Sequence, residues 1–229
     1  MCFSAGASFS ASAVIALIGV IAMTEAKTKS YRYLAVIPLL FASQQAIEGF
    51  LWLNLASGGY VVWKHILTHS FLLFAWVVWP IYIPIAMHKL ETRNKFRKIQ
   101  NIFLGIGIVV SAGLVYVMIF HHVIASSNDY HIDYTFDYHP GYTWVTNSLY
   151  LLPTVGSLII SNVKRMWVMG LFNLLSYIYT KIFFFGYVLS VWCFFGALLS
   201  TIVLWIIMTE RRKSENLPSF NENQINHII

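Results

Sequence analysis

Apolar residues are grouped into long runs along this chain, and short polar, often basic, stretches separate the runs. A transmembrane helix needs about 20 mainly apolar residues to cross the hydrocarbon layer of a bilayer. The pattern predicts an all-α integral membrane protein, a bundle of seven transmembrane helices. The predicted helices cover residues 7–25, 33–56, 63–88, 99–120, 142–161, 166–184 and 187–209.

Composition agrees with a lipid environment. Hydrophobic residues make up 58% of the chain and charged residues 10%, and the mean hydropathy is +0.67. Soluble proteins have roughly 45–50% apolar and about 25% charged residues. No repeat or linker divides the sequence. We therefore expect one transmembrane domain at 1–213, followed by a polar, disordered cytoplasmic tail at 214–229.

Basic residues indicate the orientation of the bundle. Thirteen of the 15 lysines and arginines lie after the first, third, fifth and seventh predicted helices, which places them on one side of the membrane. Cytoplasmic loops are enriched in such residues, so we expect the N-terminus outside and the C-terminus in the cytoplasm. No basic stripe interleaved with aromatic residues is present, which argues against nucleic acid as a partner.

An outer loop at 121–141 contains the alternating stretch YHIDYTFDYH at 130–139. Aromatic or apolar residues alternate there with histidine, aspartate and threonine, which is the period of a β-strand. The loop is therefore predicted to hold an extended or hairpin segment whose aromatic face lies on the bundle or on the lipid interface. The polar face could bind a metal ion, but a solvated strand face is the preferred interpretation.

The stretch FASQQAIEGFLW at 41–52 places polar side chains inside a predicted helix. Ionisable groups within a bilayer are costly, usually face the interior of the bundle and mark function. At 1.5 Å per residue, Glu48 falls in the outer half of its helix, at the depth of His69 on the next. The sequence therefore predicts an outward-facing polar cavity that holds a small-molecule or lipid ligand. The candidate ligand-binding residues are Glu48, Gln44, Gln45, Trp52, Asn147, Tyr177 and Lys181.

Glu48 is also the candidate catalytic residue. The sequence leaves its protonation state open. Its carboxyl group is either protonated, or ionised and paired with His69 or Lys181. In a different interpretation, Gln44, Gln45 and Glu48 only bond neighbouring helices to one another, as polar side chains in membranes often do.

Two histidines, His65 and His69, are spaced i, i+4, which lets both rings meet one metal ion. Two ligands alone are a weak signal, and histidines bonded to backbone or water are the preferred alternative. A divalent metal ion is therefore a candidate cofactor only if a third ligand joins them. The candidate metal ligands are His65, His69, Cys2, Cys193 and His121.

Four segments carry a resemblance: MCFSAGASFSA at the start, QQAIEGFLW, WPIYIP and WCFFGALLS. Together they resemble an uncharacterised family of bacterial multi-pass membrane proteins that begin Met-Cys-Phe-Ser-Ala. The resemblance implies a bacterial envelope protein, without implying an activity or any site residue, and we expect the multi-pass chain in the bacterial inner membrane. A looser similarity is to seven-helix hydrolases of the alkaline-ceramidase type, which hold zinc with several histidines. The last predicted helix lacks a histidine pair, so that analogy rests on fold class alone.

Three functions fit the sequence. The first is a receptor, carrier or accessory subunit that binds a ligand or metal ion in the cavity. The second is a metal-dependent hydrolase of a lipid-like substrate, in which Glu48 would activate a metal-bound water. The third is a structural or assembly subunit, in an oligomer or a larger membrane complex.

Overall fold

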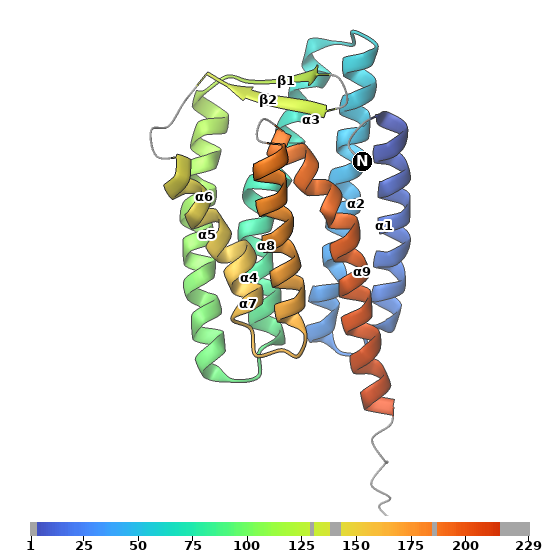
Figure 1. Ribbon diagram of the computed structural model, residues 1–229, viewed down its shortest axis with the longest axis vertical. Helices are drawn as coiled ribbons and strands as arrows, with labels where there is room; N and C mark the ends of the chain where they lie inside the picture. The colour runs from blue at the N-terminus through green and yellow to red at the C-terminus, as the bar shows by residue number, and fades with distance from the viewer. Residues whose placement is uncertain (1–3, 129–130, 138–142, 185–186, 216–229) are drawn as a thin grey trace, which may run out of the picture.

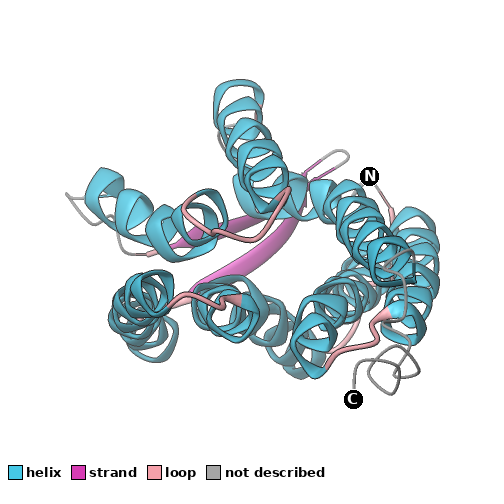
Figure 2. Cartoon of the chain, turned by 90° about the horizontal axis from the view of Figure 1, so that it is seen from below, coloured by secondary structure: helices cyan, strands magenta, loops and turns pink. Residues whose placement is uncertain are grey.

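A computed structural model of the chain describes residues 4–128, 131–137, 143–184 and 187–215. Helices run side by side over most of its length, and a pair of β-strands lies across one end (Figure 1). Figure 2 shows the helices from the opposite end, with the strands behind them. The fold is therefore a helical bundle capped at one end by a small sheet.

The elements, with η for a π-helical segment, are α1 (Ala5–Glu25), α2 (Lys29–Ala56), α3 (Val61–Leu73), η1 (Phe74–Val78), α4 (Trp79–Leu90), α5 (Asn94–Phe120), β1 (Val123–Asn128), β2 (His131–Phe136), α6 (Thr143–Leu151), η2 (Leu152–Gly156), α7 (Ser157–Ile159), α8 (Met166–Phe183) and α9 (Val188–Glu215). The helix α9 extends to Glu215, two residues into the predicted tail, and residues 216–229 lie outside the described part of the chain.

Within the described residues, five helical runs are long and apolar enough to cross a membrane. They are Ala5–Glu25, Lys29–Ala56, Val61–Leu90, Asn94–Phe120 and Val188–Arg212. The mostly helical fold and the membrane environment agree with the sequence. The predicted helices at 142–161 and 166–184 correspond to α6–η2–α7 and α8, which are not among these five, so the count of seven spans stays a prediction.

In the part of the chain that the structure describes, two π-helical segments interrupt the helical runs, and each contains or directly precedes a short stretch with a proline. In η1 the N–H of Trp79 donates to the carbonyl of Phe74, five residues earlier. The next donor in this register would be Pro80, which has no N–H, so the carbonyl of Ala75 receives no bond from that position. The second segment, η2, contains Pro153. Segments of this kind are frequent at functional sites.

The two strands form an antiparallel pair in which Val123 lies opposite Phe136. On β2, Ile132 and Tyr134 are buried, and they face the helices together with Val123 of β1. Tyr134 stacks on Phe71 with ring centroids 5.1 Å apart. The aromatic face of the alternating stretch thus packs on the bundle, while positions 130, 138 and 139 lie outside the described residues.

The segments that carry most basic residues meet at one end of the molecule. The connections α1–α2, α4–α5 and α7–α8 and the end of α9 all lie at the lower end in Figure 1. The strands and the α2–α3 connection lie at the upper end. Basic and non-basic connections alternate along the sequence, and the fold therefore gathers the basic ones at one end of the bundle.

Candidate functional site

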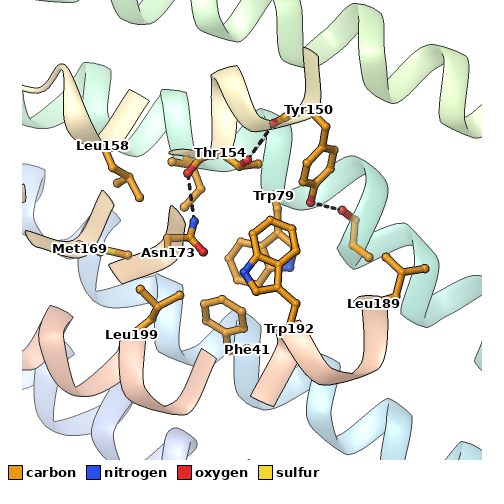
Figure 3. Close-up of a pocket in the computed structure, with 12 residues that line it drawn as sticks. Phe41, Trp79, Tyr150, Thr154, Leu158, Met169, Asn173, Leu189, Trp192 and Leu199 are labelled. Carbon is orange, nitrogen blue, oxygen red and sulfur yellow. Dashed lines mark hydrogen bonds between the residues drawn. The ribbon is translucent and has the colours of Figure 1, made fainter. Parts of the chain in front are cut away.

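A pocket lies inside the bundle, between α2, the run η1–α4, the run α6–η2–α7, α8 and α9 (Figure 3). Its empty volume is about 570 Å³, counting the part that opens out of the protein. One lining residue, Phe41, is the thirteenth residue of α2, which places the pocket about 18 Å along a helix of about 42 Å, near mid-height. The described lining residues are Phe41, Ala75, Trp79, Ile83, Tyr150, Thr154, Leu158, Met169, Asn173, Leu189, Trp192 and Leu199.

Aromatic side chains form much of the pocket wall. Phe41 and Trp79 stack with ring centroids 4.0 Å apart, and Trp192 makes an edge contact with Tyr150 at 6.0 Å. Gly196 makes room for Phe41, because a β-carbon at this position of α9 would overlap the Phe41 ring. The wall is thus apolar, and its aromatic rings hold one another in place through direct contacts.

The polar side chains of α2, Gln44, Gln45 and Glu48, form hydrogen bonds that hold this wall in place. Gln44 is buried, and its Oε1 accepts a hydrogen bond of 2.8 Å from the indole N–H of Trp79, which fixes that ring. Glu48 has an exposed fraction of 0%. Its Oε1 accepts from the Ser190 hydroxyl at 2.7 Å and its Oε2 from Nε2 of Gln45 at 3.3 Å. These side chains therefore tie α2 to α4 and to the start of α9.

Hydrogen bonds to backbone carbonyls of the π-helical region order the opposite side of the pocket. The Tyr150 hydroxyl donates to the carbonyl of Ala75 at 2.5 Å, the carbonyl that Pro80 cannot reach with an N–H. The Thr154 hydroxyl donates to the carbonyl of Tyr150 at 2.8 Å. Nδ2 of Asn173 donates to the carbonyl of Thr154 at 3.3 Å. Side chains that line the pocket thus bond to the irregular backbone around it.

Asn173 brings a polar atom into this apolar space. The side chain is only 8% exposed, and Figure 3 shows its oxygen turned toward the middle of the pocket. No described residue donates a hydrogen bond to this oxygen. None of the described lining residues is charged. The site is therefore an aromatic pocket with one open hydrogen-bond acceptor.

Comparison with known families gives one match. Residues 1–219 match a family described as "Family of unknown function (DUF6629)". The chain belongs to this family. No curated protein and no solved structure matches the chain. Membership agrees with the predicted uncharacterised family, and nothing in these comparisons supports the analogy to alkaline ceramidases.

In this DUF6629 protein the remaining predicted ligand-binding residues lie at different places. Tyr177 is buried and makes an edge contact with Trp192 at 5.2 Å, so it lies next to the pocket wall. The Lys181 ammonium lies 5.7 Å from the centre of the Tyr177 ring. Trp52 is buried in the cluster beneath the strands. Asn147 is exposed on α6 and does not line the pocket.

A pairing of Glu48 with His69 or Lys181, one of the two alternatives for this carboxyl group, is not found in the described residues. Lys181 contacts Tyr177 instead. Nδ1 of His69 bonds to the carbonyl of His65 at 2.8 Å. Because a carbonyl oxygen only accepts hydrogen bonds, this nitrogen of His69 carries a proton. His69 is thus bonded to backbone, which was the preferred alternative to metal binding.

The candidate metal ligands do not come together in the described part of the chain. The rings of His65 and His69 are 6.2 Å apart, and His121 pairs with Asp137 at 3.3 Å. No group of three histidine, cysteine, aspartate or glutamate side chains that could hold a metal ion occurs among the described residues. Cys2 and the side chain of Cys193 lie outside them.

Sequence reasoning missed the pocket residues Phe41, Trp79, Tyr150, Asn173 and Trp192 as a group. The available signals were the prolines next to them, which interrupt two helices, and a single asparagine in the apolar run of α8. Depth along a helix was the criterion for candidates, and it does not tell which face of the helix a residue occupies.

Proposed function

We propose that this DUF6629 protein is a multi-pass protein of the bacterial inner membrane that binds a small, neutral, mainly apolar ligand inside its helix bundle. It would act as a receptor, carrier or accessory subunit. The observation that carries the proposal is the aromatic pocket without charged lining residues, near mid-height of the helices.

The proposed topology is a bundle of seven spanning helices with the N-terminus outside. Thirteen of the 15 basic residues lie in or within one or two turns of the three connections and the helix end that meet at the lower end in Figure 1. The rule that cytoplasmic loops are rich in lysine and arginine assigns this end to the cytoplasm. The strand pair would then cover the outer end.

The chemistry of the pocket supports an apolar ligand. Pockets for small molecules usually combine apolar walls with few polar groups. This pocket has that character, because most of its described lining residues are aromatic or aliphatic and none is charged. At mid-height it lies at the depth of the lipid chains, where neutral apolar molecules concentrate. In this proposal Gln44 and Glu48 are positioning residues, which hold Trp79 and the start of α9 in place.

A pocket-filling substitution tests the proposal. Met169 lines the pocket on α8, and Met169→Trp would fill part of it. The matched control is Leu175→Trp, because Leu175 lies on the same helix and is exposed. The wild type and both variants would be purified in native-lipid nanodiscs, and their small molecules extracted and compared by mass spectrometry.

The expected result is a compound that is enriched with the wild type and with Leu175→Trp and lost from Met169→Trp. Identical extracts from all three proteins would contradict the proposal. A stable protein partner without such a compound would favour the assembly subunit. Stoichiometric metal that disappears in His69→Ala would favour the hydrolase.

A further inference from the structure

The amide of Asn173 has a defined orientation. Its Nδ2 donates to the carbonyl oxygen of Thr154 at 3.3 Å, across the pocket edge (Figure 3). Rotating the amide by 180° would set two oxygens against each other, since a carbonyl only accepts hydrogen bonds. The amide oxygen of Asn173 is therefore the atom that faces the pocket.

The other polar side chains among the described lining residues already have partners. The indole N–H of Trp79 donates to Gln44, and that of Trp192 donates to the Ser176 hydroxyl at 3.1 Å. The Tyr150 hydroxyl donates to a backbone carbonyl. These donors are thus engaged, while the asparagine oxygen accepts nothing from the described residues. The asparagine oxygen is thus open to a donor inside the pocket, and a ligand that supplies one gains a hydrogen bond there.

We infer that the ligand carries one hydroxyl or N–H group, which donates a hydrogen bond to the amide oxygen of Asn173, on an otherwise apolar body. This inference rests on the proposed function and adds the ligand's chemical class. The uncharged walls disfavour carboxylates and ammonium groups, because burying an unpaired charge is strongly unfavourable. Stacked rings such as Phe41 and Trp79 favour a flat body that offers its faces and edges to them.

Two probes of similar shape test the inference, 1-naphthol and 1-methoxynaphthalene. They share the ring system and the oxygen, and only 1-naphthol has an O–H donor. Binding would be measured by equilibrium dialysis against nanodiscs that hold the wild type. Uptake by nanodiscs with Met169→Trp would be subtracted, because both probes also dissolve in lipid.

We expect 1-naphthol to bind the wild type roughly three- to tenfold more tightly than 1-methoxynaphthalene, the ratio that one neutral hydrogen bond provides. In Asn173→Leu, which keeps an apolar side chain of similar size, the two probes should bind equally. If this variant does not fold, the ratio of the two probe affinities in the wild type still tests the inference.

Equal binding of both probes to the wild type would overturn the inference and leave the proposed pocket intact. The same holds if the preference for 1-naphthol persists in folded Asn173→Leu. Binding of neither probe above the Met169→Trp background would overturn both the inference and the proposed function.

Discussion

Replacing Tyr150 with phenylalanine should destabilise the protein by removing one hydrogen bond at a π-helical segment. The Tyr150 hydroxyl donates to the carbonyl of Ala75, which receives no backbone bond from Pro80. Hydrogen bonds inside membrane proteins contribute about 0.6 kcal/mol on average and up to about 1.7. A buried acceptor left without a partner costs about 1–3 kcal/mol. We expect Tyr150→Phe to lower the free energy of unfolding by about 1–2 kcal/mol.

The measurement is reversible unfolding in mixed micelles, titrated with denaturing detergent and followed by tryptophan fluorescence. Tyr116→Phe is the matched control, because Tyr116 lies on α5 with 58% of its surface exposed. Its effect should stay within about 0.5 kcal/mol, as for most surface substitutions.

A double-mutant cycle with Pro80→Ala makes the test sharper. Pro80→Ala restores a backbone N–H that can reach the Ala75 carbonyl in the register of η1. In that background, Tyr150→Phe should lower the free energy of unfolding by clearly less than in the wild type, because the Ala75 carbonyl then has a second donor. An equal cost in both backgrounds would refute the explanation that the tyrosine replaces the donor missing at the proline.

Two further predictions concern the packing of α5 and the polar stretch of α2. Gly107→Ala should destabilise the protein by about 1–3 kcal/mol, because its β-carbon would overlap the carbonyl oxygen of Pro80. Gly105→Ala on the same helix meets open space and should stabilise by about 0.5–1 kcal/mol, so equal effects in unfolding titrations would contradict the packing. Ser190→Ala should lower stability by about 1 kcal/mol alone and by less when combined with Glu48→Leu, and strictly additive effects would show that the two side chains do not interact.

The sequence predicted features that depend on local periodicity. Alternation at Ile132 and Tyr134 indicated a strand with its aromatic face on the bundle or on the lipid interface, and in the described residues both side chains are buried against the bundle. Gln44 and Glu48, four residues apart and so on one side of a helix, were expected to face the interior of the bundle, and both are buried. These predictions succeeded because neighbouring residues on a regular element have fixed relative directions.

The partners of these residues could not be read from the chain. Glu48 bonds to Ser190, 142 positions later, a partner that was not among the candidates. The packing of α2 against α9 brings Ser190 to Glu48, and this packing is not visible in the sequence. The π-helical turn η2 adds a second difficulty, because it changes the helical period between Tyr150 and the residues after it. Depth alone does not tell which face a residue occupies: Asn147, a predicted ligand-binding residue, is exposed, whereas Tyr150, about one turn away, lines the pocket.

A density map of the protein in lipid nanodiscs, at a resolution that shows side chains, tests the central claim most directly. We predict non-protein density in the pocket, between the rings of Trp79 and Trp192 and within hydrogen-bond distance of the Asn173 oxygen, and no such density in Met169→Trp. An empty pocket in the wild type, or the same density in both proteins, would contradict the account.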